Sequence, residues 1–116
     1  MYDYLDRPVA DLPTHARARL RAMRAWVHAL TLAGHSAPAD SDDAFDAAMR
    51  MLDRDSTGTL EFQRPCHATV EETEAVVLGL WSLVEADRLP AALATAALLV
   101  RADAAGAFVA AIQRTV

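Results

Sequence analysis

Residues 69–86, TVEETEAVVLGLWSLVEA, combine a helix start signal, an acidic first turn and a long apolar face. Thr69 is predicted to cap this helix, with Glu72 reaching back to the amide of Thr69, and the acidic first turn complements the helix dipole. Apolar residues recur at helical spacing on one broad face: Val70, Val77, Leu80, Trp81 and Val84. A helix this apolar has to be covered on most sides, so we expect it to be the central helix of the fold.

The length and composition limit the number of domains and the size of the hydrophobic core. A chain of 116 residues predicts one domain, residues 1–116, in which residues 1–11 form an N-terminal arm. Hydrophobic residues make up 53% of the sequence, but many of them are alanines, which contribute little bulk. We therefore expect closely packed helices, with some apolar surface left over for a partner chain.

Charge and cysteine content exclude several classes of protein. The formal net charge of −5 argues against binding to nucleic acid, because affinity for phosphates comes from lysine and arginine. A single cysteine, Cys66, rules out an internal disulfide and fits a reducing compartment. No signal segment opens the chain, and no apolar run approaches the ~20 residues of a membrane span. The prediction is a soluble, cytoplasmic protein that contacts no membrane.

Helical periodicity extends over most of the remaining sequence. A first helix is predicted from about Leu12 to Ala33 and a second from about residue 40, where Phe45, Met49 and Leu52 mark the apolar side. After the central helix, Asp87 is predicted to cap a further helix, whose apolar face would consist of Leu89, Leu93, Ala96, Ala97 and Val100. A break at residues 101–103 precedes a last apolar stretch that contains Phe108, Val109, Ile112 and Val116. Residues 88–116 could form two helices or one bent helix.

One segment departs from this pattern. Residues 53–62 contain the turn formers Ser56, Thr57 and Gly58, followed by the alternation of polar and apolar residues over 59–62 that a short strand would show. The predicted fold is therefore an all-α compact bundle of four or five helices, with a short extended or irregular segment near residues 54–68.

A basic stripe is the first candidate binding surface. Arg17, Arg21, Arg24 and His28 follow one another at helical spacing on the side of the first helix opposite its apolar stripe. Such a stripe could bind an anion or an acidic partner. The alternative is the solvated face of an amphipathic helix, or a face that pairs with the second helix, whose first turn is acidic (Asp40, Asp42, Asp43 and Asp46).

The turn at Asp53, Asp55, Thr57, Gly58 and Glu61 resembles the start of an EF-hand calcium loop. Oxygen-bearing side chains stand at its first, third, fifth and ninth positions and glycine at its sixth. The resemblance covers about a dozen residues and implies a calcium ion bound by Asp53, Asp55 and Thr57. The twelfth position, where the family has a bidentate carboxylate, is Arg64. The alternative is a tight turn built from good turn formers.

Cys66 and His67 form the second candidate site. A thiolate and an imidazole can hold zinc, and a cysteine beside a histidine base can act as a nucleophile. Adjacent residues in an extended segment point to opposite sides, however, and no second pair of ligands has metal-binding spacing. The alternative is a small buried cysteine beside a surface histidine.

No complete catalytic set is visible in the sequence, so an enzyme is not the expected class. The leading hypothesis is a protein-protein interaction or regulatory module that acts through helix surfaces as a homodimer or with a protein partner. The alternative is a small metal- or ligand-binding protein that uses Cys66 and His67, or the Asp53–Glu61 turn. No cofactor is expected apart from zinc or calcium at these two places.

Overall fold

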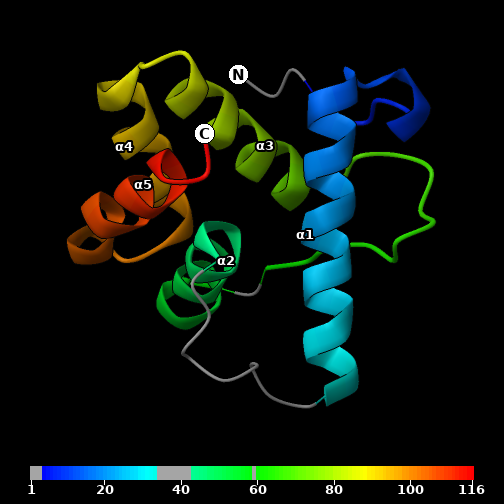
Figure 1. Ribbon diagram of the computed structural model, residues 1–116, viewed down its shortest axis with the longest axis horizontal. Helices are drawn as coiled ribbons and strands as arrows, with labels where there is room; N and C mark the ends of the chain where they lie inside the picture. The colour runs from blue at the N-terminus through cyan, green and yellow to red at the C-terminus, as the bar shows by residue number, and fades with distance from the viewer. Residues whose placement is uncertain (1–3, 34–42, 59) are drawn as a thin grey trace. The chain divides into compact units, whose positions relative to one another are not determined.

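The computed structural model describes residues 4–33, 43–58 and 60–116, and the described residues form an all-α structure (Figure 1). They contain five α-helices, two short 3₁₀ helices and no strand, which confirms the predicted fold class. The α-helices are α1 (Thr14–Ala33), α2 (Ala44–Asp55), α3 (Glu72–Glu85), α4 (Leu89–Leu99) and α5 (Ala105–Gln113), and the 3₁₀ helices are η1 (Val9–Asp11) and η2 (Ala102–Ala104).

The chain divides into two compact units. The first comprises Met1–Ala37 and Glu61–Gly79, and the second comprises Pro38–Leu60 and Leu80–Val116. The first unit thus contains η1, α1 and the start of α3, whereas the second contains α2, the end of α3, α4 and α5. The division falls within the helix that the sequence placed at the centre of the fold.

In the first unit, α1 supplies a buried stripe that includes Ala16, Leu20 and Met23, as its 3.6-residue period predicts. The N-terminal arm runs antiparallel to the residues just before α3. The amide of Asp6 donates to the carbonyl of Val70 at 2.9 Å, and the amide of Val9 donates to the carbonyl of Ala68 at 2.7 Å. These bonds hold the two segments together although the bonded residues are 64 and 59 positions apart in the sequence.

The start of α3 differs from the predicted start. The helix begins at Glu72, and it is Glu74 Oε1 that accepts a hydrogen bond from the amide of Glu71 at 3.1 Å. This is the carboxylate half of a capping box, two residues later in the chain than the predicted box at Thr69 and Glu72. Thr69 and Val70 are instead held in the extended segment by the N-terminal arm.

In the second unit, α5 packs against both α2 and α4. Trp81, on the second half of α3, is fully buried there; its indole Nε1 donates to Thr115 Oγ1 at 2.8 Å, and its ring lies 6.0 Å from that of Phe45. The end of α2 is tied to the residues after α4, since the amide of Thr57 donates to the carbonyl of Leu99 and the amide of Arg101 to the carbonyl of Asp55.

The sequence predicted that Asp87 caps α4, but in the structure Asp87 ends α3. Its φ of 59° is left-handed, its amide donates to the carbonyl of Val84 at 3.0 Å, and the amide of Arg88 donates to the carbonyl of Leu83 at 2.9 Å. This pair of bonds is a Schellman motif, in which the left-handed residue closes the preceding helix. α4 then starts at Leu89 without a side-chain cap, and Pro90 lies in its first turn.

The C-terminal stretch forms two helices, because Val100 is extended with φ −124° and ψ 168° and interrupts the helical path. Of the candidate strand, Thr59 lies outside the described residues and residues 60–63 form no strand. Within the described part of the chain, no helix is both long and apolar enough to cross a membrane.

Candidate functional site

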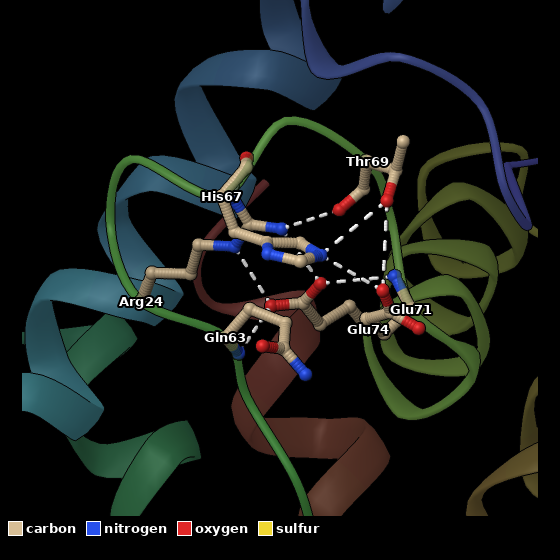
Figure 2. Close-up of polar contacts among 6 residues, drawn as sticks. All are labelled: Arg24, Gln63, His67, Thr69, Glu71 and Glu74. Atoms are coloured by element: carbon tan, nitrogen blue, oxygen red, sulfur yellow. Dashed lines mark hydrogen bonds and ion pairs between the residues drawn. The ribbon is translucent and has the colours of Figure 1, made fainter.

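The first unit contains a polar cluster between α1, the segment 63–71 and the start of α3. Figure 2 shows Arg24 of α1 and Glu74 of α3 facing each other, with Gln63, His67, Thr69 and Glu71 around them. Arg24 and His67, two residues selected from the sequence, are therefore brought together, although they belong to different predicted sites.

Arg24 is buried, with 1% of the residue exposed. Its guanidinium donates two hydrogen bonds to the Glu74 carboxylate, from Nε to Oε2 at 2.7 Å and from Nη2 to Oε1 at 2.8 Å. The same guanidinium also donates to the backbone carbonyls of His67 and Thr69, each at 2.8 Å. A planar guanidinium suits this role, because its donors diverge in a fixed fork.

Glu74 is fully buried and accepts hydrogen bonds from two sources besides Arg24. The amide of Gln63 donates to Oε2 at 2.9 Å, and the amide of Glu71 donates to Oε1 at 3.1 Å. Burial acts to raise the pKa of Glu74, but the hydrogen bonds from Arg24, Gln63 and Glu71 outweigh it, and the net pKa lies below the ordinary value. The carboxylate is therefore held in its ionised form.

This arrangement fixes the path of the segment 63–71. The Arg24 and Glu74 side chains together bind two backbone carbonyls and two backbone amides in a stretch that has no helix or strand of its own. No buried side-chain nitrogen or oxygen atom in the described residues lacks a hydrogen-bond partner. The pair thus replaces the hydrogen bonds that regular secondary structure would have supplied.

His67 and Glu71 lie at the more exposed edge of the cluster. His67 Nε2 is 2.8 Å from Glu71 Oε1, and the Thr69 hydroxyl lies 3.4 Å from the same nitrogen. Cys66 next to them is exposed and free, so it is not the small buried residue of the alternative interpretation. Over the described residues, no three Cys, His, Asp or Glu side chains are close enough to share a metal ion.

The predicted calcium ligands lie in the second unit and do not share one loop. Asp53 and Asp55 belong to the last turn of α2, whereas Thr57 follows the helix. The buried Asp55 carboxylate accepts hydrogen bonds from Arg54 at 3.1 and 2.8 Å and from Arg101 Nη2 at 2.9 Å. The bond from Arg54 is the main cause that lowers the pKa of Asp55, against the effect of burial, and Arg101 adds to it.

The basic stripe of α1 is divided by the fold. Arg21 and His28 are exposed and Arg17 is half-buried, with its Nη1 donating to the carbonyl of Ala10 at 3.4 Å. Arg24 points inward to Glu74. Binding of an anion or an acidic partner by Arg17, Arg21 and His28 stays a prediction.

The buried side of α4 matches the predicted side only in part, and the helix has an exposed apolar face. Of the predicted apolar face, Ala96 and Val100 are buried as expected, but Leu93 and Ala97 are exposed, and Ala92 and Leu99 are buried in their place. Leu93 is 42% exposed and Leu98 62% exposed, and Ala94 and Ala97 lie exposed between them. No charged residue occurs in Leu89–Leu99, so the sequence offers no polar side from which the orientation of α4 could be inferred.

Comparisons with known proteins give no assignment of family. No family model matches the chain, and the searches of curated proteins and of solved structures return no significant match.

Proposed function

We propose that the protein is an interaction module that associates with a second copy of itself through the exposed face of α4. This face, called the α4 face below, consists of Leu93, Ala94, Ala97 and Leu98. The observation that supports the proposal is the exposure of two leucines on one side of a helix without charged residues. Contiguous exposed apolar patches can mark protein-protein contacts, whereas isolated apolar residues on a surface are normal. On α4 the two leucines and two exposed alanines are neighbours on one side of the helix.

The location of the face within the second unit also supports this role. α4 is anchored on its other side through Ala92, Ala96 and Leu99, and α5 packs against it. A rigid helix with an apolar exposed side loses little conformational entropy when another helix binds to it. The polar cluster around Arg24 and Glu74, in contrast, uses its hydrogen bonds within the chain.

Sedimentation velocity of the purified chain over a wide concentration range tests the proposal. We expect reversible self-association in the wild type and its loss in the Leu98→Glu variant, because a carboxylate at this position would be taken out of water on association. Leu98 is 62% exposed within the chain, so we expect the substitution to leave the folded monomer intact.

Leu32→Glu on α1 is the matched control. Leu32 is 75% exposed and receives the same change of charge, but it lies outside the α4 face. We expect this variant to associate like the wild type. A wild-type chain that stays monomeric at every concentration, or equal loss of association in both variants, would contradict the proposal.

A further inference from the structure

The α4 face has a symmetric order of side-chain sizes. Leu93 and Leu98 form its two edges, and Ala94 and Ala97 lie between them, so the order large, small, small, large reads the same in both chain directions. The midpoint of this pattern lies between Thr95 and Ala96. At 3.6 residues per turn the four positions share one side of the helix, with the alanines in the middle and the leucines at the edges.

We propose that two copies pair antiparallel through α4, with the twofold axis passing between Thr95 and Ala96. This inference rests on the proposed self-association and specifies its geometry. A twofold interface uses the same patch on both chains, so the patch must be complementary to itself. Antiparallel pairing places Leu93 in one layer with Leu98 of the second copy and Ala94 in one layer with Ala97 of the second copy. The central alanines let the two backbones approach closely.

The charges of the helix ends favour the same orientation. An α-helix carries partial positive charge at its N-terminus and partial negative charge at its C-terminus. Antiparallel pairing sets opposite ends of the two α4 helices side by side, whereas parallel pairing would set like ends together. The charged side chains near the helix ends do not oppose this orientation. One acid and one arginine lie before the helix (Asp87 and Arg88) and one of each lies after it (Asp103 and Arg101), so the charges cancel at each end.

The size of the face predicts a weak dimer. Stable interfaces bury about 800 Å² on each partner. Four side chains, two of them alanines and neither leucine fully exposed, offer considerably less. We therefore expect association that rises with concentration in the high micromolar range, and a cross-link is the suitable way to read its orientation.

Disulfide cross-linking in a Cys66→Ser background distinguishes the two orientations. Antiparallel pairing brings position 94 of the two chains within about 4.5 Å along the helix axis and keeps position 90 about 16 Å apart, at 1.5 Å per residue. We expect Ala94→Cys to give disulfide-linked dimers under mild oxidation and Pro90→Cys to stay monomeric on non-reducing gels. Both residues are exposed, and circular dichroism verifies that each variant keeps its helix content.

Three other outcomes are informative. Equal cross-linking at both positions would indicate parallel pairing and overturn the inference. Association in sedimentation without a cross-link at position 94 would indicate another interface, and it would overturn the inference while leaving self-association intact. A chain that never associates would remove the proposed function as well.

Discussion

Arg24 and Glu74, 50 residues apart in the sequence, form a buried ion pair in which two donors of the guanidinium meet both carboxylate oxygens. Breaking a buried pair by removal of one partner typically costs about 3–5 kcal/mol, because the other charge remains buried without compensation. We therefore expect Arg24→Met and Glu74→Leu each to lower the free energy of unfolding by about this amount. Urea denaturation monitored by circular dichroism would measure it.

The double variant Arg24→Met/Glu74→Leu gives a sharper prediction. Replacing a buried pair by apolar residues is often neutral or stabilising. Here the pair also binds the carbonyls of His67 and Thr69 and the amides of Gln63 and Glu71, which the apolar residues cannot bind. Each buried backbone group left without a partner costs about 1–3 kcal/mol. We expect the double variant to remain clearly less stable than the wild type, and a double variant of wild-type stability would contradict this role.

The lowered pKa of Glu74 predicts loss of stability in acid. A carboxyl group whose pKa is lower in the folded state stabilises the fold above its unfolded pKa, and this contribution disappears as the pH falls through the folded pKa. The ordinary pKa of Glu74 is 4.5, so the decline begins near this pH and continues below it. The pKa of Asp55 is also lowered, so Asp55 adds to the loss of stability as the pH falls below its ordinary pKa of 3.8.

Urea midpoints measured between pH 7 and pH 3 test this dependence. The Glu74→Gln variant should be less stable at neutral pH and should lose less stability on acidification than the wild type. Glu72→Gln is the matched control, because Glu72 is exposed in the first turn of the same helix. Parallel curves for wild type and Glu74→Gln would show that Glu74 does not control acid stability.

Much of the helical structure was predictable because it follows local periodicity. Of the apolar face predicted for the central helix, Val77, Leu80, Trp81 and Val84 are buried on α3, whereas Val70 is buried in the extended segment before the helix. The burial of Glu74 on that face was not predicted, although its spacing from the apolar residues indicates it. Glu74 lies three residues before Val77 and seven before Trp81, in line with the apolar face, but its place in an acidic first turn favoured a role at the helix dipole. Arg24 was missed similarly, although it is four residues after the buried Leu20.

Other features depend on contacts that the sequence does not encode locally. The arm forms antiparallel hydrogen bonds with residues 68–70, so these residues are extended and α3 begins only after Thr69. Asp87 has the side chain of a good N-cap, but in the structure it ends the previous helix with a left-handed φ of 59°, a conformation that aspartate adopts more readily than most residues. The orientation of α4 is decided by packing alone, since no polar side distinguishes its faces.

The left-handed conformation of Asp87 predicts the effect of substitutions there. Glycine adopts a positive φ without steric cost, so Asp87→Gly should keep the Schellman motif and raise the free energy of unfolding by up to about 1 kcal/mol. Asp87→Val should lower it by about 1–2 kcal/mol, because a branched side chain disfavours φ near 59°. Thermal denaturation of the two variants measures the difference. Equal stability of Asp87→Gly and Asp87→Val would contradict the assigned conformation.

The hydrogen bond between Trp81 and Thr115 links the end of the chain to the buried face of α3. Thr115→Val keeps the shape of the side chain but removes the hydroxyl that accepts from the indole Nε1. We expect a loss of about 0.5–1.5 kcal/mol and a shift of the Trp81 emission to shorter wavelength, because the ring loses a polar neighbour. Trp26→Phe should serve as the background, so that Trp81 is the only tryptophan observed.

In the Trp26→Phe background iodide should scarcely quench the emission of the native protein, since Trp81 is fully buried. Quenching as efficient as that of the urea-unfolded chain would refute the position of Trp81 in the core, and with it the packing of the second unit on which the α4 face depends.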